Sequence, residues 1–188
     1  MKIRQATKPK SHPLLQTIIP VTRTRIIPPR RRSDLLSRQR LLDLLRDLLD
    51  CKLILIVAPA GYGKTSLLID LAHYTELPVC WYALDPLDSD LQRFITHFIA
   101  AIAYRFPRFG QQSAAGLQGI SPTDYDLNRL VTTIVNEAYE HIREHFALVL
   151  DDYQFVGNNQ AISRFVSHFI QEVDENCHLI ISSRTLLT

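Results

Sequence analysis

Two glycines, a lysine and a threonine lie together in one short stretch of the sequence, residues 58–65. Gly61 and Gly63 would let the backbone curl so that its N–H groups point inward at a phosphate. Lys64 would reach β- and γ-phosphate oxygens, and Thr65 would offer its hydroxyl to Mg²⁺. We therefore predict a Walker A loop that binds ATP or ADP with Mg²⁺. The residues expected to contact the nucleotide here are Ala60, Gly61, Tyr62, Gly63, Lys64, Thr65 and Ser66.

Two adjacent carboxylates, Asp151 and Asp152, follow the apolar run 146–150. Parallel α/β folds place their ligand sites at the C-terminal ends of strands, so the pair is typical of a Walker B motif. We expect Asp151 to hold Mg²⁺ and Asp152 to orient or deprotonate the attacking water. The plain alternative is a pair of loop acids that cap the next turn. Arg184 follows the apolar run 178–182, and an arginine there can contact the γ-phosphate, although by itself it could equally be a surface residue.

Other groups of potentially reactive residues favour no site. His141 and His145 belong to an H-x-x-E-H pattern, but no third zinc ligand is placed on a suitable later helix. The cysteines are odd in number and far apart, which indicates buried thiols rather than disulfides or a zinc site. They are Cys51, Cys80 and Cys177.

Apolar runs alternate with helical patterns along the chain. The expected strands are 53–57, 79–84, 146–150 and 178–182. The expected helices span about 38–50, 64–74, 89–106, 121–145 and 160–173. We expect Ser37 to cap the first helix and a Ser89/Gln92 capping box to open the third. Residues 108–121 are expected to form a surface loop. This alternation predicts an α/β fold, a three-layer P-loop NTPase with a mostly parallel sheet. We expect the fourth strand to lie between the first and the third, and Trp81 and Tyr82 to lie in the core.

The composition allows one core, with 188 residues of which 46% are hydrophobic. Residues 1–50 carry 12 basic and 4 acidic residues, whereas residues 51–188 carry 9 and 15. The basic arm could contact nucleic acid, but its prolines and its lack of aromatic residues also fit a solvated leader. No run of eighteen apolar residues and no signal peptide is present, which predicts a cytoplasmic protein without membrane contact.

Three segments together, 58–65, 148–155 and 179–185, resemble the N-terminal P-loop ATPase of MalT/LuxR-type regulators, which belong to the STAND (NACHT-like) branch. The likeness extends to residues 26–29, 36–41, 81–85 and 93–94, and so covers about residues 22–188. One departure is Gln39, which stands where a proline would be usual in the family. This resemblance implies that residues near Pro29 and Arg38 pack on the adenine, and that Arg184 is the sensor of the γ-phosphate. Asp152, Lys64 and Arg184 are then the expected catalytic residues.

The resemblance also implies domain boundaries. We expect residues 1–21 to be a basic leader and residues 22–188 to be a P-loop domain truncated after its fourth core strand. In a full-length relative, an inducer and DNA would bind to further domains. The expected function is ATP-Mg²⁺ binding with slow hydrolysis as the switch of a signal-transducing transcriptional regulator. A small-molecule kinase and a nucleic-acid-stimulated ATPase stay open as alternative functions. Nucleotide-dependent self-association is a further possible interaction.

Overall fold

The computed structural model describes residues 19–32, 36–118 and 123–186, so most of the expected leader lies outside the described residues. The strands are β1 (Leu53–Val57), β2 (Val79–Ala83), β3 (Phe146–Asp151) and β4 (Cys177–Ser183). The helices are α1 (Gln39–Asp47), α2 (Lys64–Tyr74), α3 (Leu91–Arg105), α4 (Gln111–Leu117), α5 (Asp124–His141) and α6 (Gln160–Glu172). Short 3₁₀ turns lie at η1 (Arg23–Arg25), η2 (Pro86–Ser89) and η3 (Tyr153–Phe155).

The four described strands form one parallel sheet with the order β1-β4-β3-β2. This order confirms that the fourth strand lies between the first and the third. Every residue of β3 and of β4 is buried, as the uninterrupted apolar runs of central parallel strands predict. The ends of β3 and β4 therefore lie side by side, and the loop after β1 lies next to the end of β4.

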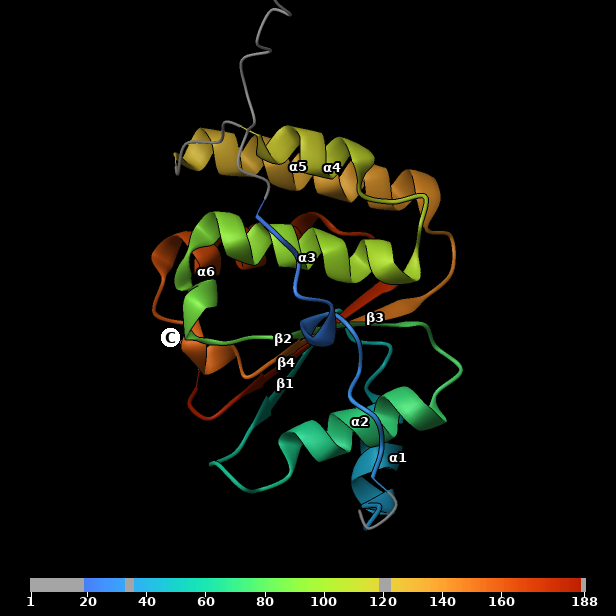
Figure 1. The fold of residues 1–188 in the computed structure, drawn as a ribbon. Coiled ribbons are helices and arrows are strands. Elements are labelled where there is room, and N and C mark those ends of the chain that lie inside the picture. Colours follow the sequence, from blue (N-terminus) through green and yellow to red (C-terminus); the bar gives the residue numbers. More distant parts are fainter. Residues whose placement is uncertain (1–18, 33–35, 119–122, 187–188) are drawn as a thin grey trace, which may run out of the picture.

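Helices cover both faces of the sheet (Figure 1). α1 and α2 lie on one face and α3 and α6 on the other, while α4 and α5 form a further layer over α3 and α6. Trp81 is fully buried in the core under α1 and α2, and Tyr82 is fully buried in the core under α3 and α6. Both residues are thus core side chains, as expected. Among the described residues, no helix is long and apolar enough to cross a membrane.

The segment before α1 runs past α3 and β2 toward α1 (Figure 1). Its Ile26 is buried in the core under α3 and α6. Arg25 forms ion pairs with Asp85 and Asp88 of the turn after β2 and donates to the carbonyl oxygen of Ala83 at 3.0 Å. These contacts attach the segment to the edge strand of the sheet.

A second attachment lies closer to α1. Arg31 Nε donates to Asp70 Oδ1 of α2 at 2.7 Å, and the Arg31 guanidinium lies 5.5 Å from the ring centre of Tyr74. Two arginines of the basic arm, Arg25 and Arg31, therefore pair with carboxylates of the same chain, which weakens the case for the arm as a nucleic-acid contact.

The expected surface loop over 108–121 is wrong for the stretch that forms α4. The carboxylate of Glu137, on α5, accepts from the backbone N–H groups of Gln112 and Ser113 at 3.0 and 2.8 Å, and from the Ser113 hydroxyl. Burial by itself would raise the pKa of Glu137, but these hydrogen bonds outweigh it and lower that pKa. A carboxylate from a neighbouring helix thus stabilises the start of a segment whose own sequence is typical of a loop.

Two expected helix caps are also wrong. Ser37 does not cap α1, because Arg38 occupies the cap position and makes no side-chain cap hydrogen bond. Ser89 does not cap α3, since Asp90 accepts from the backbone N–H of Arg93 at 2.8 Å. In both cases the cap lies one residue later than expected, within the usual uncertainty of a helix boundary.

The helix expected to run to residue 145 ends at His141, so the two histidines of the H-x-x-E-H pattern do not share a helix. His145 instead lies against His178, with Nδ1 of the first 3.0 Å from Nε2 of the second. No group of three or more His, Cys, Asp or Glu in the described part of the chain could hold a metal ion. Cys51 is exposed, contrary to expectation, because it lies in the turn before β1.

Candidate nucleotide site

The loop between β1 and α2 has the backbone conformation that its glycines predict. Gly61 and Gly63 have φ of 80° and 76°, in the left-handed region that side chains with a Cβ disfavour. The N–H of Ala58 donates to the carbonyl oxygen of Ser183 at 3.2 Å, which ties the start of the loop to the end of β4. A Cβ added at Gly61 would meet no atom within 4 Å, so space is open beside this position.

Lys64 is the first residue of α2 and is only 8% exposed. Its ammonium donates to the carbonyl oxygens of Ala58 and Pro59 at 2.7 and 3.2 Å. The side chain therefore folds back under the loop and keeps its charge next to the loop backbone. An ammonium in this position is a donor that phosphate oxygens could attract away from the carbonyls.

Thr65 and Asp151 come from different elements and meet at the same end of the sheet. Thr65 Oγ1 donates to Asp151 Oδ2 at 2.9 Å, and the hydroxyl of Ser182 donates to Asp151 Oδ1. Burial raises the pKa of Asp151, helped by the charge of Asp152, while the two hydroxyl hydrogen bonds oppose the rise. A buried carboxylate beside a threonine hydroxyl is an oxygen donor set of the kind that Mg²⁺ takes. The residues present thus fit the metal that the sequence predicts.

Asp152 has φ of 60° and is the only described residue other than glycine with a positive φ. Aspartate adopts this conformation more readily than most residues, and such outliers often lie at functional sites. Its backbone N–H donates to Ser182 Oγ at 3.0 Å, and its Oδ1 accepts from Gln154 Nε2 at 2.8 Å. These two hydrogen bonds connect the backbone of Asp152 to Ser182 of β4 and its carboxylate to Gln154 of η3.

Arg184 lies directly after β4, with about half of its side chain exposed. Its Nε is 3.9 Å from Asp152 Oδ1, and its guanidinium lies 5.9 Å from the ring centre of Phe155. The backbone N–H of Arg184 donates to Gln154 Oε1 at 3.1 Å. The structure therefore brings Arg184 and Asp152 together, with Gln154 between them.

The segment before β1 also reaches the loop. Arg38 Nη1 donates to the carbonyl oxygen of Tyr62 at 2.7 Å, and a Cβ at Gly63 would lie 3.2 Å from Arg38 Nη2. Arg38 therefore lies against the loop between β1 and α2, whereas Pro29 is an exposed residue farther back in the segment. Packing of either residue on an adenine stays a prediction.

Two residues of this site were missed by the sequence analysis. Ser182 bridges the end of β4 to both aspartates, and a hydroxyl two residues before Arg184 was the available signal. Gln154 had no comparable signal, because a glutamine after two acids is unremarkable in a sequence.

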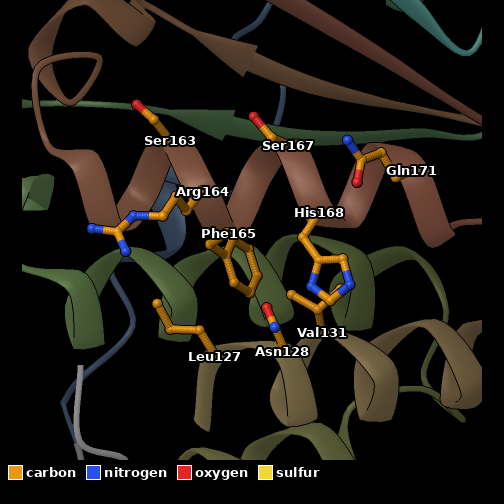
Figure 2. Close-up of a pocket in the computed structure, with 9 residues that line it drawn as sticks. All are labelled: Leu127, Asn128, Val131, Ser163, Arg164, Phe165, Ser167, His168 and Gln171. Carbon is orange, nitrogen blue, oxygen red and sulfur yellow. The ribbon is translucent and has the colours of Figure 1, made fainter. Parts of the chain in front are cut away.

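A groove elsewhere contains none of the predicted site residues. It lies between α5 and α6, has a volume of about 450 Å³, and combines apolar and polar side chains (Figure 2). The lining residues are Leu127, Asn128, Val131, Ser163, Arg164, Phe165, Ser167, His168 and Gln171. The candidate nucleotide site is therefore separate from this groove.

Comparisons with known proteins agree with the fold and with the family that the sequence resembles. The chain is 33% identical over 159 residues to the HTH-type transcriptional regulator MalT of Klebsiella pneumoniae, and 34% identical over 158 residues to that of Yersinia pestis. Each match covers 84% of this chain but only 17% of the relative, so the chain spans about a sixth of the length of these relatives. No protein-family model matches the chain.

Among solved structures, the Drosophila ORC bound to AT-rich DNA and Cdc6 contains a chain that superposes with a TM-score of 0.50 at 13% identity. That match covers 79% of this chain and 46% of the other, and at such low identity it speaks for the fold alone. The sequence relationship, the parallel sheet and the loop before α2 together identify this chain as a P-loop ATPase domain of the MalT type.

Proposed function

We propose that the chain binds ATP with Mg²⁺, hydrolyses it slowly, and acts as the nucleotide switch of a signal-transducing transcriptional regulator. The observation that carries this proposal is the meeting of Lys64, Thr65 and Asp151 at one end of the sheet. A cation, a hydroxyl and a carboxylate at the start of a helix are the groups needed to hold phosphates and a divalent metal.

Each residue would have a separate task in this site. Lys64 and the loop N–H groups would hold the phosphates, while Thr65 and Asp151 would hold Mg²⁺, which neutralises phosphate charge when bound. Asp152 would accept a proton from the water that attacks the γ-phosphorus, as the bond to the β,γ-bridging oxygen breaks and ADP leaves. Arg184 would contact the γ-phosphate and so separate ATP from ADP.

The regulatory part of the proposal rests on the relatives, whose name describes them as HTH-type transcriptional regulators. DNA and inducer would be bound by parts of a longer protein that correspond to the rest of the relatives' length. The present domain would change its contacts with those parts according to the nucleotide it holds.

Calorimetric titration with ATP and ADP, each with and without Mg²⁺, tests the binding. Asp152→Asn should bind ATP normally but turn it over about 10²- to 10⁴-fold more slowly, because a general base acts on the water and not on the phosphates. A chain that binds neither nucleotide would refute the proposal. Stimulation of turnover by DNA, or transfer of the phosphoryl group to a small acceptor, would favour the two alternative functions instead.

A further inference from the structure

Gln154 makes one hydrogen bond to each of the two residues proposed to act on the γ-phosphate. Its Nε2 donates to Asp152 Oδ1 at 2.8 Å, and its Oε1 accepts from the backbone N–H of Arg184 at 3.1 Å. A carboxylate can only accept and a backbone N–H can only donate, so one orientation of the amide satisfies both partners. Gln154 is half-buried in the turn η3, which joins the end of β3 to the segment before α6.

We propose that Gln154 is a positioning residue that couples the water-activating Asp152 to the γ-phosphate sensor Arg184. This inference rests on the proposed function and adds the regulation of the same site. When Arg184 moves toward a γ-phosphate, its backbone N–H moves with the end of β4, and the Gln154 amide passes that shift to the Asp152 carboxylate. Asp152 is then aimed at the attacking water only when ATP is present.

The geometry around Asp152 explains why such a coupling would be needed. Asp152 has a left-handed backbone conformation, and its Oδ1 accepts from the Gln154 amide at 2.8 Å and lies 3.9 Å from Arg184 Nε. About a third of the Asp152 side chain is exposed, so burial does little to fix its rotamer. The orientation of the carboxylate therefore depends on the partners of Oδ1. Of these, the short Gln154 contact is the one that stays in place when Arg184 Nε turns to a phosphate.

Two variants of Gln154 test the coupling. Gln154→Ala removes both hydrogen bonds and should lower the single-turnover rate by about 10- to 100-fold, since a misplaced catalytic group costs roughly that much. The ratio of ATP to ADP affinity should also fall, because the backbone of Arg184 loses its partner. Gln154→Glu keeps the acceptor for Arg184 but places a second negative charge against Asp152. It should retain the affinity ratio and still lose turnover.

A double variant separates positioning from a merely structural effect. If Gln154 acts through Asp152, then Gln154→Ala should cause no further loss of turnover in an Asp152→Asn background. Gln171→Ala, which truncates an exposed glutamine on α6, is the matched control and should change nothing. Circular dichroism of each variant verifies that the fold is kept.

The outcomes distinguish this inference from the proposed function. A wild-type chain that does not bind ATP would refute both. A wild-type chain that hydrolyses ATP, together with unchanged turnover in Gln154→Ala, would overturn the coupling alone. The coupling would also be overturned if Gln154→Ala lowered turnover by the same factor in the wild-type and in the Asp152→Asn backgrounds.

Discussion

The ammonium of Lys64 is the most direct link between this structure and nucleotide binding, and Lys64→Met removes it while keeping a side chain of similar length. In the wild-type chain the ammonium already has two carbonyl partners, those of Ala58 and Pro59. Phosphate oxygens must therefore compete with two existing hydrogen bonds. The binding free energy that Lys64 contributes is therefore the difference between its hydrogen bonds to phosphate and its hydrogen bonds to the two carbonyl groups.

The magnitude follows from this exchange. Two charge-assisted hydrogen bonds to phosphate would contribute about 1.5–3 kcal/mol each, and the two carbonyl contacts that are given up offset a large part of that sum. A net loss of about 2–3 kcal/mol corresponds to roughly a 30- to 140-fold weaker Kd for ATP. Loss of fold stability should stay below about 1 kcal/mol, because Ala58 and Pro59 are at least partly exposed and water can replace the ammonium on their carbonyls.

Titration calorimetry with a non-hydrolysable ATP analogue and Mg²⁺ measures the affinity, and urea unfolding measures the stability. Lys52→Met is the matched control, since Lys52 lies before β1, at the opposite end of that strand from the loop. Equal analogue affinities for the wild-type and Lys64→Met chains would refute the P-loop assignment. A stability loss well above 1 kcal/mol would show that the carbonyl contacts matter more to the fold than we infer.

Three other predictions concern the metal, the N-terminal segment and the outer helices. Asp151→Asn should abolish the gain in ATP affinity on adding Mg²⁺ while leaving metal-free binding nearly unchanged, and a Mg²⁺ effect of normal size would contradict the role of Asp151. Arg25→Ala should destabilise the fold by about 1–3 kcal/mol in urea, because Asp88 is fully buried and loses one of its cationic partners. An unchanged unfolding midpoint would speak against the attachment to the β2 edge. Glu137→Gln should lower stability at neutral pH, and the difference from wild type should shrink in acid. The pKa of Glu137 is lowered in the fold, so its stabilisation is present above the ordinary value of 4.5 and is lost as pH falls through the lower folded pKa. A pH-independent difference would refute the Ser113 contact as its source.

Much of the fold could be predicted from local patterns. The four apolar runs became the four strands. β3 and β4 are buried along their whole length, as an uninterrupted apolar sequence predicts, whereas β1, at an edge of the sheet, is exposed at Leu53, Leu55 and Val57. The helix starting at Lys64 and the one starting at Gln160 were also placed correctly. The failures lie where local preference is weak, as in α4, whose first turn depends on Glu137 from another helix.

Part of the candidate site could also be predicted from local sequence. The loop between β1 and α2 is contiguous in sequence, so its glycines, lysine and threonine could be recognised together. Its two glycines have the expected left-handed conformation. Asp151 and Asp152 were recognised from their place after an apolar strand. The roles of Asp151 in metal binding and of Asp152 in hydrolysis stay predictions.

By itself, the sequence determined the fold class, the loop and the acidic pair, because each is encoded by neighbouring residues with a characteristic spacing. Only the tertiary structure decided that Thr65 meets Asp151, which is 86 residues away, and that Ser182 and Gln154 join the ends of β3 and β4. Contacts of this kind depend on strand order and register, which bring distant side chains to within hydrogen-bonding distance. No local spacing specifies them, because the energy that selects the order and register comes from burying the whole sheet between its helices.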